Sequence, residues 1–327
     1  MYQANFVTLL RMRRISKKLL RSFSRYKYPV MKFLLSCWLI PMIQLVAFMC
    51  YRSAGAHEKT ALVVTSRSNE VSASFACLVP KLRDASVEVI LVSENQSDLG
   101  LMSKIRHIYR FFGLCKTADY VFLDDTYLPV SYALKYRWLF RPRVVQLWHS
   151  AGLFKRVGLD ITSNWLDSFL MRLNFRNFDL VIVSAEHCRA PIAGFMGVDT
   201  AKVIALGTSY TDRYVASDTD RNRAPRGAGK KTVAYAPTFR GDAHKVKPSP
   251  APSVATVFAK LEPGFECYIS KHPQEDFVSE EFKPQFKLSD ALSEIDVLIT
   301  DYSSIAMDYM LANPQGELVL YVPKTML

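Results

Sequence analysis

The stretch VVQLWHSAGLFKRVG, residues 144–158, decides how this chain is to be interpreted. An apolar run carries His149 to the end of a predicted strand, and a small-residue turn then leads into a basic segment. A histidine at the exit of a buried strand, beside backbone amides and cations, suits chemistry on an anionic substrate. The alternative is a buried histidine that is satisfied by a backbone carbonyl. The neighbouring Ser150, Gly152 and Lys155 favour the functional interpretation, in which His149 is a general base.

Short apolar, β-branched runs alternate with helix-length segments on both sides of this stretch. Runs buried on both faces and separated by helices predict parallel sheets. A first set of predicted strands comprises residues 61–65, 87–92, 120–123, 144–148, 180–184 and 203–206, and a second set comprises residues 232–236, 266–270, 296–300 and 318–322. The sequence therefore predicts an α/β protein with two Rossmann-like, doubly wound domains that face one another across a cleft.

The predicted organisation has three parts. Residues 1–54 form a basic arm and an apolar segment, residues 55–216 an N-terminal domain, and residues 217–327 a C-terminal domain. The second domain begins with a Gly-, Pro- and Arg-rich stretch that has no apolar periodicity and is typical of a linker. Ligands of doubly wound sheets bind outside the carboxyl ends of the strands. Motifs that follow strands are therefore where chemistry is expected.

The net charge of +12 is concentrated at the N-terminus. Nine Lys or Arg residues and no acid lie between Met1 and Lys32, and the first acid is Glu58. Apolar residues alternate with these cations in a pattern that fits a basic amphipathic helix on an anionic membrane surface. A solvated basic tail is the alternative. Nucleic-acid binding is not predicted, because the charge adjoins an apolar segment.

That apolar segment, residues 33–51, is uncharged and just long enough to span a bilayer. Pro41 and Gln44 lie in its middle, so a kinked or shallow insertion is also open. The positive-inside rule would keep the arm in the cytoplasm and export the rest of the chain, whereas the motifs described below suit a cytosolic protein. We expect a membrane-embedded anchor that holds a catalytic body at the cytoplasmic face of the cell membrane.

Neither the cysteines nor the acidic residues form a recognisable metal site. The six cysteines are scattered without C-x-x-C spacing, which predicts reduced thiols rather than disulfides or a zinc site. Asp124 and Asp125 follow a predicted strand, but nothing near them in the sequence adds further ligands. We predict no metal and no bound cofactor.

Two motifs of the C-terminal domain present cations at strand ends. In YAPTFRGD, residues 235–242, Thr238 and Arg240 follow a strand, and arginine suits bidentate contact with phosphate. In ISKHP, residues 269–273, Lys271 and His272 follow another strand. A protonated His272 would stabilise a diphosphate or a leaving phosphate. The alternative for both motifs is an ordinary strand–loop junction.

A third motif, DVLITDYSSIAMD, spans residues 296–308. Its strand stops at Asp301, and Ser303 or Ser304 then opens a helix. Serine at a helix N-terminus caps the helix, and the free amides with the hydroxyls form an anion site. A plain N-cap is the alternative.

The order of these motifs resembles the CDP-glycerol glycerophosphotransferases of teichoic acid and capsule synthesis. Four blocks carry the resemblance: QLWHSAGLFKRVG at 146–158, YAPTFRGD at 235–242, SKHP at 270–273 and DVLITDYSSIAMDY at 296–309. The resemblance covers residue 60 to the end. It implies a GT-B-like fold, association with the cytoplasmic face of the membrane, and transfer of glycerol phosphate or ribitol phosphate from a CDP-activated polyol to a lipid-linked saccharide or growing polymer.

The resemblance also implies roles for individual residues. His149 matches the family's histidine base, while Arg240, His272, Ser303 and Ser304 match positions around the donor diphosphate. Thr238, Lys271 and Asp301 belong to the same motifs and are also expected to bind the donor diphosphate.

Two departures from the family pattern leave alternatives open. The chain has W-H-S-A-G where many members have W-H-G-T or W-H-A-C-G, and it stops at Leu327, soon after a predicted strand. A truncated C-terminal domain, and with it an inactive membrane-bound member of the family, is one alternative. A GT-B glycosyltransferase that uses a nucleotide sugar is the other.

Overall fold

The computed structural model describes residues 30–49, 59–65, 69–95, 99–133, 142–149, 153, 156–215, 230–238, 241–242, 245–246, 258, 260, 264–270 and 288–322. The basic arm predicted before residue 30 lies outside these ranges. The described residues include the apolar N-terminal segment and the strands of two sheets.

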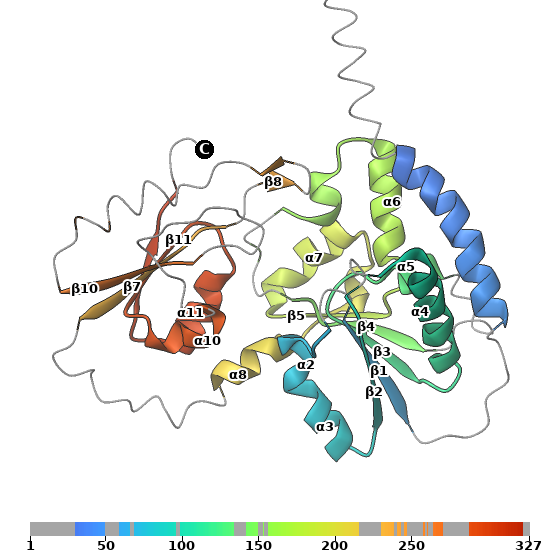
Figure 1. Ribbon diagram of the computed structural model, residues 1–327, viewed down its shortest axis with the longest axis horizontal. Coiled ribbons are helices and arrows are strands. Elements are labelled where there is room, and N and C mark those ends of the chain that lie inside the picture. Colours follow the sequence, from blue (N-terminus) through green and yellow to red (C-terminus); the bar gives the residue numbers. More distant parts are fainter. Residues whose placement is uncertain are drawn as a thin grey trace, which may run out of the picture. The chain divides into compact units, whose positions relative to one another are not determined.

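Six strands form the first sheet, in the order β2-β1-β3-β4-β5-β6 (Figure 1). Their bounds are β1 Thr60–Thr65, β2 Glu88–Ser93, β3 Tyr120–Leu123, β4 Arg143–Gln146, β5 Leu180–Val183 and β6 Val203–Ala205. The pairings from β2 through β5 are parallel. All six residues of β1 are buried, as expected for a strand with neighbours on both sides and helices on both faces.

Four strands form the second sheet, in the order β10-β7-β11-β12, and all of its pairings are parallel. Their bounds are β7 Lys231–Ala236, β10 Phe265–Ile269, β11 Val297–Thr300 and β12 Glu317–Leu320. The predicted α/β class with two parallel sheets is confirmed, and most strand ends lie within one or two residues of the prediction. A short antiparallel pair, β8 (Gly241–Asp242) with β9 (Lys245–Val246), was not predicted.

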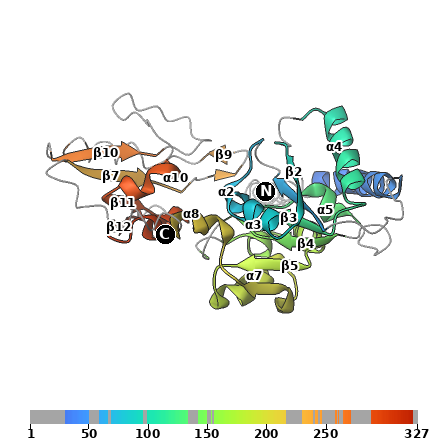
Figure 2. The ribbon, with the colours of Figure 1, turned by 90° about the horizontal axis from the view of Figure 1, so that it is seen from below.

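Helices connect the strands of both sheets. The helices that accompany the first sheet are α2 Ala73–Ala76, α3 Leu78–Asp84, α4 Leu101–Leu114, α5 Leu128–Tyr132, α6 Trp165–Phe175 and α7 Arg189–Met196. The chain then continues with α8 Asp212–Val215, α10 Leu288–Ala291 and α11 Ile305–Ala312. Helix α6 starts where the Asn164 side chain accepts a hydrogen bond from the Asp167 N–H, as an N-cap does. Helix α7 packs beside β6, and Figure 2 shows α7 at the β5 end of the first sheet.

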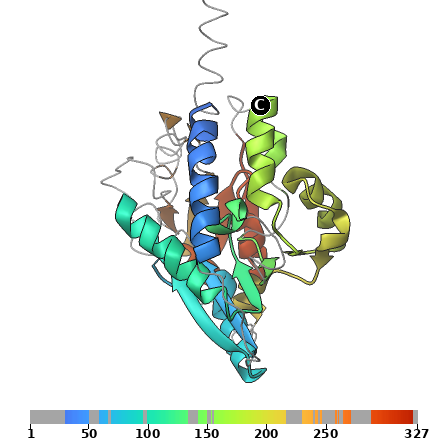
Figure 3. The same cartoon turned by 90° about the vertical axis from the view of Figure 1, so that its right-hand side faces the viewer.

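The predicted apolar segment is confirmed as one helix, Val30–Met49, called the N-terminal helix below. Figure 3 shows it lengthwise, between α4 and α6. Its most apolar window has a mean hydropathy of 1.8, so its length and composition would allow it to cross a membrane. Core helices and signal sequences have similar properties, and hydropathy alone therefore does not decide its role.

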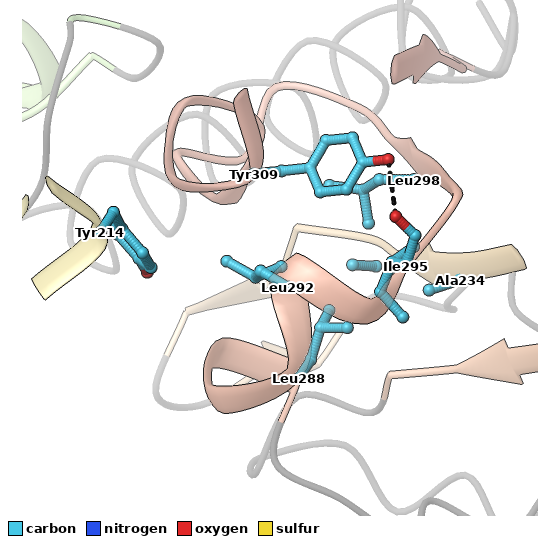
Figure 4. Packing of buried hydrophobic residues seen from close by; sticks show 8 residues of the cluster. Tyr214, Ala234, Leu288, Leu292, Ile295, Leu298 and Tyr309 are labelled. Carbon is cyan, nitrogen blue, oxygen red and sulfur yellow. Dashed lines mark hydrogen bonds between the residues drawn. The ribbon is translucent and has the colours of Figure 1, made fainter. Parts of the chain in front are cut away.

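The chain divides into two compact units. One comprises Met1–Trp148, Arg156–Ile182 and Arg189–Ala205, and the other comprises His149–Lys155, Val183–Cys188 and Leu206–Leu327. The domain boundary expected at residue 216 stays a prediction. Tyr214, on the N-terminal side of it, already packs into the core of the second unit (Figure 4).

Tyr309 organises that second core. Its side chain is 1% exposed, and its hydroxyl donates to the carbonyls of Ile295 (3.0 Å) and Asp296 (2.9 Å), where β11 begins. Gly316 lies so close to the Tyr309 ring that a Cβ atom there would collide with it. The P-Q-G turn before β12 thus needs a glycine because of this close approach.

We expect Tyr309→Phe to lower the free energy of unfolding by about 0.5–1.5 kcal/mol, because the bonds from the hydroxyl are lost while the Asn313 side chain and the Glu317 N–H still donate to the two carbonyls. Urea denaturation measures this loss. Tyr321→Phe is the matched control, since the Tyr321 side chain is 44% exposed. Equal stabilities of the two variants would contradict the role given to the Tyr309 hydroxyl.

Candidate active site

The peptide that leads into His149 is held in an unusual conformation. Trp148, which follows β4, has a φ of 61°, in the left-handed region. For a residue other than glycine this conformation costs about 1–2 kcal/mol. His149 itself is exposed at this turn. The chain therefore turns sharply just before the predicted base, and something must stabilise the turn.

Two side chains bind this turn through both polar backbone atoms of Trp148. The Gln146 side-chain oxygen accepts from the Trp148 N–H (2.9 Å), and the Ser74 hydroxyl donates to the Trp148 carbonyl (3.2 Å). Gln146 is fully buried, and its amide donates to the backbone carbonyl of Asp125 at the end of β3 (3.1 Å). We call Gln146 and Ser74 the Trp148 clamp. The clamp ties the His149 turn to two other strand connections of the same sheet.

The Trp148 clamp has a packing component as well. The Trp148 indole lies against the Phe195 ring of α7, with 5.7 Å between the ring centroids. Each hydrogen bond of the clamp is worth about 1 kcal/mol. Two bonds and a ring contact are therefore enough to offset the strain of the turn and to hold it in one conformation.

Asp124 and Asp125 lie next to the clamp and are both buried. Burial raises the pKa of Asp124, and the charge of Asp125 adds to the rise. The described residues contain no group of three His, Cys, Asp or Glu side chains that would hold a metal ion. The absence of a metal site stays a prediction, since parts of the motifs lie outside the described ranges.

In the second unit, Thr238 and Asp301 bind each other. The N–H and the hydroxyl of Thr238 both donate to one carboxylate oxygen of Asp301, at 3.0 and 2.6 Å. Both residues are buried, at 5% and 2% exposure. The Thr238 hydroxyl, which was predicted to contact the donor diphosphate, thus already has an anionic acceptor. This geometry favours a supporting role, in which the pair links the loops that follow β7 and β11.

Ser303 and Ser304 lie at the start of α11. Ser304 occupies the N-cap position but makes no capping bond with its side chain. Among the residues that the structure describes, the Ser303 hydroxyl accepts a long bond from the Ile305 N–H, at 3.4 Å. Both serines are half-buried. Within the described part of α11, the helix start thus offers two half-buried hydroxyls to an anion, while the N–H groups of Ala306 and Met307 already donate to the carbonyls of Ser303 and Ser304.

The remaining predicted site residues lie outside the described ranges: Ser150, Gly152, Lys155, Arg240, Lys271 and His272. The strands that lead to Arg240, Lys271 and His272 are described. The Ser270 N–H donates to the Tyr235 carbonyl at 2.8 Å, so β10 and β7 run side by side up to the residue before Lys271. Since β11 flanks β7 on its other side, the three motifs of this unit leave neighbouring strands at the same edge of the sheet.

Comparison with known proteins bears on what this edge does. Residues 45–315 match the family of CDP-Glycerol:Poly(glycerophosphate) glycerophosphotransferases. The chain belongs to this family. The resemblance seen in the sequence is thereby confirmed, and the chain is a teichoic acid polyol-phosphate transferase family member.

Curated relatives of this glycerophosphotransferase family member act on two polyols. The chain is 28% identical to the teichoic acid ribitol-phosphate polymerase TarK of Staphylococcus aureus over 77% of this chain and 53% of TarK. It is 27% identical to the teichoic acid ribitol-phosphate primase of Bacillus spizizenii, over 78% and 71% of the two chains. The glycerol-phosphate primase of Bacillus subtilis is 22% identical, over 78% and 65%. The chain thus spans about half the length of TarK.

Solved structures support the fold of this family member. The wall teichoic acid polymerase TagF aligns with a TM-score of 0.60 at 15% identity, over 93% of this chain and 79% of TagF. A UDP-N-acetylglucosamine 2-epimerase aligns with a TM-score of 0.53 at 11% identity, over 83% and 80% of the two chains. The GT-B-like fold implied by the resemblance is confirmed.

Sequence reasoning missed the Trp148 clamp. Gln146 is polar within an otherwise apolar strand, and such a residue has to find partners when it is buried. The polar Gln146 in this strand was therefore the sequence signal for the clamp. Ser74 gave none, because it precedes Trp148 by 74 residues and belongs to the short helix α2.

We expect Ser74→Ala to lower kcat by about five- to tenfold, because loss of one clamp bond, worth about 1 kcal/mol, loosens the His149 turn. Steady-state kinetics with a fixed donor measure this change. Ser131→Ala is the matched control, since it also removes buried bonds from a serine hydroxyl to carbonyls, those of Tyr127 and Asn174. A similar fall in kcat for both variants would mean that the effect is general.

We expect Asp124→Asn to raise the free energy of unfolding at pH 7. The folded-state pKa of Asp124 is raised above 3.8, so its ionisation costs stability as the pH rises from the unfolded pKa through the folded pKa. Below the unfolded pKa this cost disappears. The gain from Asp124→Asn should therefore shrink toward pH 3 in urea titrations, and a gain that grows on acidification would contradict the assignment.

Proposed function

We propose that this chain transfers glycerol phosphate, or the related ribitol phosphate, from a CDP-activated polyol to a lipid-linked saccharide or growing polymer of the teichoic acid type and releases CMP. The observation that carries the proposal is the emergence of three phosphate-suited motifs at one edge of the second sheet in a member of this family. A helix start with two half-buried serine hydroxyls belongs to one of them.

The reaction needs a base and a stabilised leaving group. His149 takes the proton of the acceptor hydroxyl, and the oxygen of that hydroxyl attacks the β-phosphorus of the CDP-polyol. A new P–O bond forms, the bond between the β-phosphorus and the bridging oxygen breaks, and CMP leaves with that oxygen and its electron pair. A general base contributes about 10²- to 10⁴-fold to such a step.

The donor's charge would be met by Arg240, Lys271, His272 and the serines that open α11. An arginine binds phosphate oxygens bidentately, and a helix start adds amides and a favourable dipole. The bonds between Thr238 and Asp301 give these residues a different part in the proposal. They hold the loop after β7 at a fixed distance from the loop that leads to Ser303.

Donor choice is tested by incubating the purified full chain with CDP-glycerol, CDP-ribitol or a UDP-sugar, together with a lipid-linked teichoic acid acceptor. Release of CMP with a CDP-polyol is the expected result. The CDP-polyol that gives the faster release of CMP identifies the polyol phosphate that is transferred. Release of UDP would favour the glycosyltransferase alternative. No turnover of any donor by the folded protein would favour the inactive member.

We expect His149→Ala to lower kcat by at least ~100-fold without unfolding the protein, because the acceptor hydroxyl loses its base. CMP release and circular dichroism measure the two properties. His187→Ala is the matched control, since His187 is also exposed and its segment belongs to the same compact unit. Full activity in a folded His149→Ala variant would remove His149 from the mechanism.

A further inference from the structure

His107, in α4, is a buried polar residue that the candidate active site does not use. Of the histidines that the structure describes, it alone is buried, with a side chain that is 3% exposed. Its Nδ1 lies 2.6 Å from a carboxylate oxygen of Glu94, and its Nε2 lies 2.5 Å from the Tyr127 hydroxyl. Both ring nitrogens are therefore bonded, as buried polar groups have to be. We call Glu94, His107 and Tyr127 the His107 bridge.

The His107 bridge lies along one edge of the first sheet. Glu94 directly follows β2, and Tyr127 follows β3 after a short turn. Both strands are parallel to β1, so their carboxyl ends meet at the same edge. Strand β4 is parallel to β3, and its carboxyl end carries the chain to Trp148 and His149. The bridge thus belongs to the edge from which the His149 turn leaves the sheet.

Tyr127 is fixed by its surroundings as well as by His107. It is 1% exposed, and its ring meets the Phe111 ring edge to face, with 4.9 Å between the centroids. Its backbone carbonyl accepts from the N–H of Ser131 (2.9 Å) and from the Ser131 hydroxyl (3.1 Å), where α5 begins. A residue packed in this way transmits a displacement to its neighbours, because protein interiors have low compressibility.

The Trp148 clamp holds the same segment two residues before Tyr127. The Gln146 amide donates to the backbone carbonyl of Asp125 at 3.1 Å, and the Gln146 side-chain oxygen accepts from the Trp148 N–H. Between the two attachment points, the Asp125 carboxylate accepts from the N–H of Thr126 at 2.6 Å. The segment from Asp125 to Tyr127 is therefore bound to the clamp at one end and to the His107 bridge at the other.

We propose that His107 is a positioning residue for His149 and acts through Tyr127 and the Trp148 clamp. The inference rests on the proposed function, since that proposal makes His149 the base. A base works only at the right distance from the acceptor hydroxyl, and a misplacement of about 1 Å can cost about 10²-fold in rate. The His107 bridge fixes the far end of the segment on which the clamp depends, so it limits how far the His149 turn can move.

The alternative is a core histidine that stabilises the first unit and does nothing else. The two roles differ in what they predict for catalysis. The groups proposed to bind the donor belong to the second unit, so a positioning role changes kcat and leaves the KM for the donor unchanged. A purely stabilising role changes Tm and leaves both constants of the folded protein unchanged.

Kinetics of two variants test the proposal. We expect His107→Ala and Tyr127→Phe each to lower kcat for CMP release ~10-fold at an unchanged KM for the CDP-polyol. Tyr127→Phe keeps the ring and removes only the hydroxyl, so it tests the link even where His107→Ala fails to fold. Thr60→Val is the matched control, because Thr60 is 2% exposed and its hydroxyl donates to Glu88 (3.1 Å) at the opposite edge of the same sheet. It should lower Tm and leave kcat unchanged.

A double variant tests whether the effect passes through the clamp. Ser74→Ala removes one clamp bond, so adding it to Tyr127→Phe should lower kcat by less than the product of the two single losses, as for residues that act as one unit. Losses that multiply would mean that the bridge and the clamp act independently, and this result would overturn the proposal. An unchanged kcat in folded Tyr127→Phe would overturn it as well.

A spectroscopic measurement separates this proposal from the proposed function. The chain has four tryptophans, and in protein labelled with 5-fluorotryptophan the ¹⁹F signal that Trp148→Phe removes belongs to Trp148. We expect this signal to shift or broaden in Tyr127→Phe and to stay unchanged in Thr60→Val. If the wild-type protein releases no CMP but the Trp148 signal responds, the proposed function fails while the link from His107 to the turn stands. A Trp148 signal that ignores Tyr127→Phe overturns the link, whatever the activity.

Discussion

Parallel strand pairing is the constraint on which the rest of this molecule depends. In the second sheet β10, β7 and β11 are neighbours in register, with Ile269 and Ile299 both opposite Tyr235. Parallel strands end at the same edge, so loops that are far apart in the sequence leave the sheet together. The loops after these three strands carry the phosphate-suited residues. The starts of these loops therefore lie together because of the sheet, before any side chain of the site forms a contact.

Side chains then set the positions that the sheets leave open. In the second unit, one carboxylate oxygen of Asp301 accepts two bonds from Thr238. In the first unit, Gln146 joins the end of β3 to Trp148. Each contact joins the loops of two neighbouring strands and is largely buried. A buried polar side chain without partners would cost about 1–3 kcal/mol, so these polar residues are stable there only in the bonded arrangement.

The sequence was sufficient for the strands and insufficient for these contacts, for physical reasons. A strand such as β1 is a run of buried apolar residues, and burial on both faces shows directly in composition. The bond between Thr238 and Asp301 joins residues 63 positions apart, and no local pattern encodes such a pairing. The left-handed Trp148 was also hidden, because a bulky residue rarely adopts a positive φ and no local pattern marks the position. The N-terminal helix shows the same limit. Its hydropathy was plain, while its docked face depended on Tyr132, 88 positions after Gln44.

The N-terminal helix and the Trp148 clamp meet at one place in the first unit, the exit of β3. Asp125 follows β3 and receives the amide of Gln146 from the clamp. Seven residues later, Tyr132 ends α5 and holds the N-terminal helix through Ser36 and Gln44. One short segment, from β3 through α5, therefore supports the turn before His149 on one side and the N-terminal helix on the other. A change in this segment would reach both, because the carbonyls of Asp125 and Tyr132 are held by side chains from different parts of the chain.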